Sequence, residues 1–155
     1  MKTSQRPQSV RKLRITRIEH LAAQLDTTPK KLIKISENPE KYYVDFKRNV
    51  KGKSRELVRV NNPLAEIQGK ILHRIISRLT PTKVSYGSVK GRGAYQNALV
   101  HAKSPYILKL DIKSFYPSIR YRKVFKFFFD MGCSPEVSRI MTFLSTRRHS
   151  LPLGT

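Results

Sequence analysis

The sequence has little cysteine, few acidic side chains and no long apolar run among its 155 residues. Its single cysteine, Cys133, excludes an internal disulfide, and no Cys/His cluster is present that would bind structural zinc. No apolar stretch approaches the roughly 18 to 20 residues that span a bilayer, and the N-terminus lacks the apolar region of a secretion signal. These absences favour a soluble intracellular protein without a membrane partner.

Acidic residues are scarce. The chain has 10 Asp and Glu and 32 Lys and Arg, which gives a formal net charge of +22. Residues 1–60 have 16 basic and 6 acidic side chains, and residues 61–155 have 16 and 4. An excess spread along the whole chain is typical of a protein that follows a nucleic-acid backbone over much of its surface. The basic surface of a ribosome-associated protein is an alternative. With 39% hydrophobic residues, the chain is not a disordered basic tail.

Apolar periodicity predicts a mixed α/β layered domain. Two β-like runs, 42–48 and 55–60, flank a basic tip and predict a hairpin, and the apolar run 106–112 predicts a further strand. Helical spacing predicts helices over 18–25, 29–37, 63–80, 94–102, 121–131 and 135–144. The first two helices, separated by a tight turn, are also compatible with a DNA-binding helix-turn-helix.

Asp111 closes the predicted strand 106–112 and is the only acid between Glu66 and Asp130. A buried carboxylate is costly unless it is paired or binds a cation. Two interpretations follow: Asp111 is a plain acid in the turn that ends a strand, or it points into a cleft where it binds Mg²⁺.

The neighbours of Asp111 favour the second interpretation. Residues 110–119, LDIKSFYPSI, resemble the first catalytic palm motif of reverse transcriptases. The resemblance implies that Asp111 is catalytic and binds both Mg²⁺ ions of a two-metal mechanism, and that Ile112 offers its backbone carbonyl to the metal. It also implies that Tyr116 packs under the incoming sugar and excludes a 2′-hydroxyl.

Further segments resemble the same family in the same order. Residues 53–58, KSRELV, resemble the fingers hairpin, which implies that Arg55, with Lys53 beside it, binds the incoming nucleotide. Residues 63–68, PLAEIQ, resemble the start of the fingers helix that follows. Residues 151–155, LPLGT, resemble the start of the palm segment LPQGxPTSP, with Leu153 in place of the usual glutamine. An apolar side chain cannot replace the hydrogen bond of that amide.

A glycine-rich loop narrows the resemblance to bacterial retron enzymes, which are related to those of group II introns. Residues 87–93, GSVKGRG, precede Asn97-Ala-Leu-Val-His101, which resembles a region that retron reverse transcriptases use to engage their own structured RNA. Lys90 and Arg92 would neutralise phosphates that approach the glycine backbone. Taken alone, the loop is also compatible with a solvated turn, and the histidine with a structural role.

The resemblance covers residues 13–155 and implies an α+β fold, the fingers and the first part of the palm of a right-hand polymerase, incomplete as given. The Y-x-D-D motif, which supplies further metal-binding carboxylates, is absent from the sequence. We therefore expect the 155 residues alone to be inactive. The implied domains are a loose arm (1–12), a helical segment (13–38), fingers (39–104) and a truncated palm (105–155).

The implied function is RNA-directed DNA synthesis by a retron-type enzyme of the bacterial cytoplasm, in anti-phage defence. Its partners would be dNTPs, a structured non-coding RNA as template and primer, the RNA–DNA product, and an effector or toxin protein. The alternative is a basic nucleic-acid-binding module, either a helix-turn-helix or an RNA-binding scaffold, without catalysis of its own.

Three other features have plainer interpretations. Cys133 is expected to be a small buried residue and not a nucleophile. The phenylalanines of helix 121–131 are expected to form core and not a base-stacking platform, with Phe127 the one to test for exposure. Arg147, Arg148 and His149 either contact nucleic-acid phosphates or form a solvated turn.

Overall fold

The computed structural model describes residues 12–50 and 52–152, and the chain forms two compact units. The first unit contains residues 1–79 and 114–155, and the second contains residues 80–113. Two predicted features lie outside the described residues. They are residues 1–11 of the predicted loose arm and Leu153 of the LPLGT segment.

Two short helices open the first unit, α1 (Ile18–Gln24) and α2 (Pro29–Glu37), as predicted. The Thr28 hydroxyl accepts a hydrogen bond from the Lys31 amide, and Pro29 follows in the first helical position, so the start of α2 is capped. Both helices are amphipathic, and their buried residues belong to the core of this unit.

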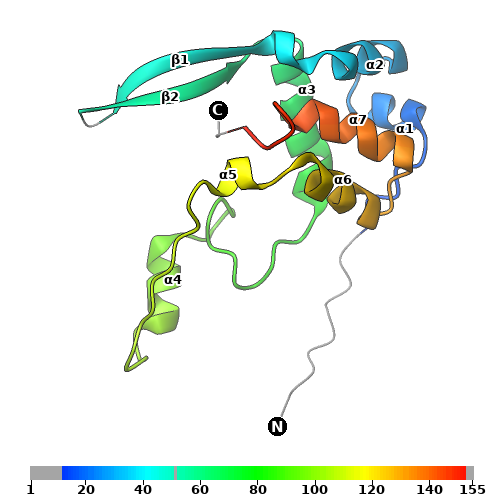
Figure 1. Ribbon diagram of the computed structural model, residues 1–155. Coiled ribbons are helices and arrows are strands. Elements are labelled where there is room, and N and C mark those ends of the chain that lie inside the picture. The colour runs from blue at the N-terminus through cyan, green and yellow to red at the C-terminus, as the bar shows by residue number, and fades with distance from the viewer. Residues whose placement is uncertain (1–11, 51, 153–155) are drawn as a thin grey trace. The chain divides into compact units, whose positions relative to one another are not determined.

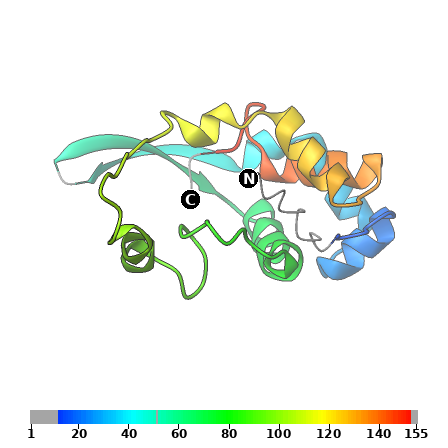
Figure 2. The same ribbon diagram turned by 90° about the horizontal axis from the view of Figure 1, so that it is seen from below.

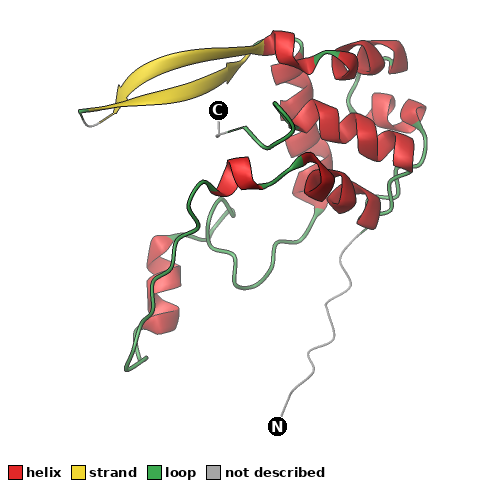
Figure 3. Ribbon diagram, viewed as in Figure 1, coloured by secondary structure: helices red, strands yellow, loops and turns green. Residues whose placement is uncertain are grey.

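The predicted hairpin is confirmed as strands β1 (Tyr43–Val50) and β2 (Lys53–Val60), reached from α2 through the 3₁₀ turn η1 (Pro39–Tyr42). The strands pair antiparallel in a register that sets Asp45 opposite Val58 and Arg48 opposite Arg55. Figure 3 shows this yellow hairpin beside the red helices of the same unit. Helices with one small antiparallel sheet make the described residues an α+β fold, as predicted.

The predicted long helix 63–80 is confirmed, although its hydrogen bonding changes along its length. It begins as α3 (Leu64–Lys70), continues as the π-helical segment η2 (Ile71–Ile75) and ends in the 3₁₀ turn η3 (Ile76–Arg78). Its apolar residues Leu64, Ile67, Ile71 and Ile75 are buried. Leu72 is also apolar but is 54% exposed, because it lies about 100° around the helix from Ile71.

Helix α7 (Pro135–Ser145) forms the centre of the core. It packs against α1, α2, α3 and α6 (Tyr121–Asp130), and Figure 1 shows it among these helices. The Ser134 hydroxyl caps its start by accepting from the Val137 amide. Its buried side chains are Val137, Ser138, Ile140, Met141, Thr142 and Leu144.

Gly132 separates α6 from α7 in a left-handed conformation with φ of +86°, which glycine adopts without strain. There the chain meets the N-terminal segment: the Leu13 amide donates to the Met131 carbonyl at 2.8 Å, and the Ser134 amide to the Ile15 carbonyl at 3.1 Å. Cys133, at this junction, is buried as predicted, and burial raises the pKa of its thiol.

The second unit contains helix α4 (Ala94–His101), as predicted, between irregular segments. The predicted buried strand 106–112 is wrong: these residues have no strand hydrogen bonds and are exposed. A strand forms only when a neighbouring strand pairs with it. The sheet of the described residues contains only β1 and β2, so the apolar run has no pairing partner there.

The prediction that the phenylalanines of α6 form core is only partly right. Phe128 is buried together with Val124, but Phe127 and Phe129 are exposed and Phe125 is half-buried. A helix turned toward the core along Val124 and Phe128 leaves rings at neighbouring angles outside it. None of the helices in the described ranges is long and apolar enough to span a bilayer.

Candidate functional site

Arg147 fastens the base of the hairpin to the turn that follows α7. Its Nη1 and Nη2 donate to Oδ1 and Oδ2 of Asp45 at 2.6 and 2.7 Å, a fork onto a carboxylate 102 residues earlier in the chain. Its Nε lies 3.6 Å from Oε2 of Glu40, too far for a hydrogen bond, and its guanidinium lies 5.4 Å from the Tyr43 ring centroid. The Arg147 side chain is only 10% exposed.

Gln68 adds a second fastening at the same place. Its Nε2 donates to the Tyr43 hydroxyl at 3.0 Å and to the Leu144 carbonyl at 2.8 Å. This one amide therefore joins α3, the first residue of β1 and the end of α7. Burial raises the pKa of the Tyr43 phenol, which stays protonated at neutral pH.

The turn 147–150 presents Arg148 to solvent from a strained backbone. The Arg147 amide donates to the Ser150 carbonyl at 2.8 Å, and the Ser150 amide donates back at 2.9 Å. The two central residues, Arg148 and His149, have φ of 46° and 62°, which non-glycine residues rarely adopt. Two further bonds hold the turn: the Arg148 amide donates to Glu40 Oε1 at 2.6 Å, and the Tyr121 amide to the His149 carbonyl at 2.8 Å.

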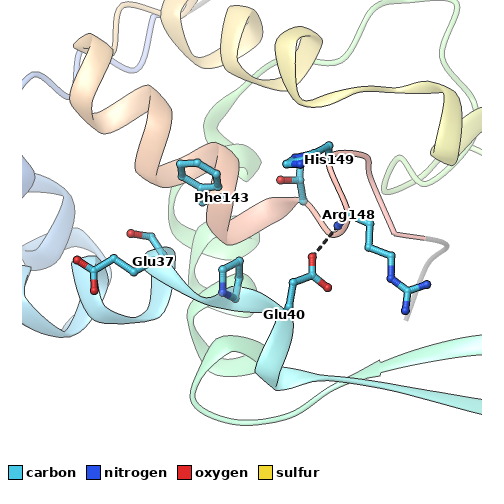
Figure 4. A pocket seen from close by; sticks show the side chains of 8 residues that line it. Glu37, Glu40, Phe143, Arg148 and His149 are labelled. Atoms are coloured by element: carbon cyan, nitrogen blue, oxygen red, sulfur yellow. Dashed lines mark hydrogen bonds between the residues drawn. The ribbon is translucent and has the colours of Figure 1, made fainter.

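A cavity of about 570 Å³ lies between this turn and the end of α2 (Figure 4). Phe143 of α7 forms one wall, and the dashed line in Figure 4 marks the bond from the Arg148 amide to Glu40. The residues that line this cavity are Ser36, Glu37, Pro39, Glu40, Phe143, Thr146, Arg148 and His149.

A smaller cavity, of about 230 Å³, brings together residues of three predicted motifs. Tyr116, in the short helix α5 (Phe115–Ser118), lines it with Gln68 of the PLAEIQ segment and with Leu151 and Pro152 of the LPLGT segment. Its other lining residues are Ile71, Leu72, Ile76 and Ser145. Tyr116 is half-exposed and meets the Phe115 ring edge-on at 5.5 Å.

The predicted nucleotide-binding residues Lys53 and Arg55 lie on β2, opposite Val50 and Arg48. The structure describes the backbone of these two residues and not their side chains. Both terminal nitrogens of the Arg147 guanidinium donate to the Asp45 carboxylate. A contact of Arg147 with nucleic acid stays a prediction. Arg148 is the freer cation, with 74% of its side chain exposed and one contact of 3.5 Å to Asp45.

In the second unit, Arg92 stabilises the loop that contains it. Its Nη1 donates to the carbonyls of Thr82 and Ser85 at 2.7 and 2.9 Å. Lys90 is exposed, and Gly91 follows with φ of +76°. Asn97 and His101 are four residues apart on α4, which places both on one exposed face. Their proposed contacts with RNA stay predictions.

Asp111 and Ile112 are exposed in irregular backbone of the second unit, whereas Tyr116 and Arg55 belong to the first. A carboxylate and a carbonyl are hard oxygen ligands that suit Mg²⁺. Across residues 12–50 and 52–152, however, no three His, Cys, Asp or Glu side chains gather in a group that could hold a metal ion. The donor chemistry of Asp111 and the Ile112 carbonyl suits Mg²⁺, but they do not form a metal site among the described residues, and their metal role stays a prediction.

Sequence reasoning missed the partners of Arg147, namely Glu40, Tyr43 and Asp45, and the role of Gln68. One signal was present: Asp45 is the only acid in β1, a strand that also contains Lys47 and Arg48. A lone carboxylate in a basic strand points to a specific cation partner.

The ion pair between Asp45 and Arg147 should make the stability of the fold depend on pH, because the Arg147 hydrogen bonds lower the pKa of Asp45. A lowered pKa means that the stabilisation is complete above the ordinary value of 3.8 and disappears as pH falls through the folded value. We expect Asp45→Asn to lower the melting temperature by about 2 to 4 °C at pH 7. The loss should shrink toward pH 2, as measured by circular dichroism.

Glu56→Gln is the matched control on the same hairpin. Glu56 pairs with Lys47 at 3.9 Å, and both side chains are largely exposed, so its removal should leave the melting temperature within about 1 °C. An equal loss in the two variants, or a loss at Asp45 that does not depend on pH, would contradict the assigned pair.

The helix-turn-helix hypothesis is not favoured by the position of α2. Leu32 and Ile35 of this helix are buried in the core, and α2 packs against α7 from the other end of the chain. A helix-turn-helix made of α1 and α2 alone would lack that packing partner.

The comparisons with known proteins agree with the motifs. No family model matches the chain. The retron Se72 reverse transcriptase of Salmonella heidelberg (strain 579083-10) is 31% identical over 143 residues, which are 90% of this chain and 38% of the relative. The retron Ec86 reverse transcriptase of Escherichia coli is 28% identical over 112 residues, 72% of this chain and 35% of the relative. The chain thus spans less than two fifths of the length of these two relatives, and over that span it is related to the retron reverse transcriptases.

Proposed function

We propose that the protein is an RNA-directed DNA polymerase of the retron type, and that this chain supplies its fingers and the first part of its palm. The supporting observation is the relationship to retron reverse transcriptases over 90% of the chain. The cavity that joins Tyr116 to Gln68, Leu151 and Pro152 is a second support, because three predicted motifs meet there.

The hairpin is the proposed fingers element. Arg55 lies on β2 beyond the point where Asp45 and Arg147 fasten the hairpin, and an arginine there would both stack on the nucleotide and contact its phosphates. Tyr116 is the proposed sugar gate, since an aromatic wall beside the sugar leaves no room for a 2′-hydroxyl.

Asp111 and the Ile112 carbonyl are the proposed ligands that this chain gives to Mg²⁺. When bound, the metal lowers the pKa of the attacking hydroxyl and neutralises phosphate charge. The role of Asp111 is to present one carboxylate to the metal, with the remaining carboxylates supplied from outside the described residues.

By the same resemblance, template and primer are a structured RNA, and the setting is anti-phage defence in the bacterial cytoplasm with an effector protein. Lys90, Arg92, Asn97, His101 and Arg148 are the proposed contacts to that RNA. Their exposure or loop position is compatible with this role. Arg147 is proposed mainly as the fastening of the hairpin.

Primer extension with the complete protein tests the proposed function. We expect incorporation of dNTPs on an RNA template, dependent on Mg²⁺, with ribonucleotides discriminated against. Residues 1–155 alone should give no product, because Asp111 can contact both metal ions but cannot hold them without the further carboxylates of a two-metal site. RNA binding by the complete protein without any extension would favour the scaffold alternative.

A further inference from the structure

Four aromatic rings form a row on α6 that continues onto α7. Tyr121, Phe125 and Phe129 follow each other at four-residue spacing, with ring centroids 6.4 and 6.1 Å apart and interplanar angles of 19° and 11°. Tyr121 also lies 5.2 Å from Phe143, which forms a wall of the cavity in Figure 4. Figure 2 shows α6 and α7 running alongside each other. We call these four residues the aromatic row.

The aromatic row is not needed to fill the core. Val124 and Phe128 bury the inner face of α6, whereas Phe129 is 49% exposed and Tyr121, Phe125 and Phe143 are half-buried. Single exposed apolar residues are ordinary on protein surfaces. A connected row of partly exposed rings that ends at a cavity is a candidate binding surface.

Cations lie directly beside the row. Arg122 and Lys126 each follow a ring of the row by one residue, so they form a parallel line about 100° around α6, and both are exposed. Lys126 pairs with Asp130, the one acid of α6, at 2.9 Å, and would have to exchange this exposed partner for a phosphate. At the cavity end, Arg148 supplies a further cation, and the Glu40 carboxylate is already bonded to the Arg148 amide. Exposed Glu37 at that end and Glu136 on α7 are the nearby acids of these elements.

We propose that the aromatic row binds a single-stranded segment of nucleic acid, whose bases stack on the rings while Arg122 and Lys126 contact its phosphates. Rings alternating with cations suit this ligand, because every base has a face that stacks and every nucleotide carries a charge. A protein partner would need acidic side chains placed to match the cations, whereas a nucleic-acid strand has a phosphate at every nucleotide. The choice of RNA over DNA as the ligand rests on the proposed function.

The spacing of the row fits a single strand whose bases are stacked. Four residues of helix rise by about 6 Å, and stacked nucleotides rise by about 3.4 Å each. One ring therefore meets about every second base. Duplex bases are hidden in the helix interior and cannot stack on the row, so the surface discriminates between single strands and duplexes.

The test measures binding by the complete protein to a fluorescent single-stranded RNA of about 12 nucleotides, by anisotropy in EDTA and without dNTPs. The double substitution Phe125→Leu with Phe129→Leu keeps apolar bulk but removes two stacking faces, and should weaken binding at least about tenfold. Phe127→Leu is the control on the opposite flank of α6, where Phe127 is similarly exposed, and should stay within about twofold. Arg122→Gln with Lys126→Gln should lower the slope of log K against log salt by about 1.4.

Melting temperatures of all variants establish that each is folded, and a duplex RNA and a DNA strand of the same length complete the experiment. Equal losses for duplex and single strand, or unchanged binding by the Phe125/Phe129 variant, would overturn the proposal and indicate that another part of the protein covers the row. If the Phe125/Phe129 substitutions weaken the binding of the DNA strand more than that of the RNA strand, the row is a binding surface but RNA is not its ligand. Because the assay contains no dNTP or metal, its outcome is independent of primer extension, which alone tests the polymerase.

Discussion

Asparagine in place of Asp111 is expected to abolish primer extension by the complete protein, with a loss of about 1,000-fold or more. Asparagine is nearly isosteric but neutral, so it removes the negative charge that would hold Mg²⁺ while leaving the bulk of the side chain. Asp111 is exposed in irregular backbone, so the substitution costs no core packing. Single-nucleotide extension on an annealed RNA template gives the readout.

Two controls separate a metal role from general damage. Asp130→Asn removes another exposed acid, which pairs with Lys126 on the surface, and should leave extension within about twofold. RNA binding by the Asp111 variant should not be weakened, since the carboxylate that is removed would repel phosphates and not attract them. Extension that survives the Asp111 substitution would refute the metal-ligand role.

Leu64→Ala is expected to give the largest loss of stability, about 2 to 5 kcal/mol in the free energy of unfolding. Leu64 is fully buried at the start of α3, against the core that α7 organises, and truncation to alanine leaves a cavity that rigid neighbours cannot fill. Urea unfolding followed by circular dichroism measures the change.

Leu72→Ala makes the same chemical change on the same continuous helix. Because Leu72 is 54% exposed, its removal should cost about 1 kcal/mol or less. Similar losses at the two positions would mean that the helix is oriented differently from the structure.

Local signals explain why most helices and the hairpin could be predicted. Thr28-Pro29 and Ser134-Pro135 start helices through caps that lie within three residues of their partners, and glycine at 52 marks the hairpin tip. Such signals need no knowledge of the rest of the fold.

Features that depend on distant partners could not be predicted in the same way. The pairing of Asp45 with Arg147 joins positions 102 residues apart. The apolar run 106–112 contains strand-forming residues, but a strand also needs a neighbour, which pattern alone does not supply. The rings of α6 have helical spacing on more than one face, so periodicity could not show which face turns to the core. Of the candidate site, the sequence indicated Tyr116 and Arg148 but not the fastening that surrounds Arg147.

The central position of α7 has a consequence for biosynthesis. Helices α1, α2 and α3 all precede it by many residues, yet their buried side chains pack against it. At a translation rate of about 5 to 20 residues per second, the apolar stripe of α3 waits about 4 to 15 s for Ser145 to be added. During that interval Leu64 and Ile67 lack the packing partner that α7 gives them in the folded protein.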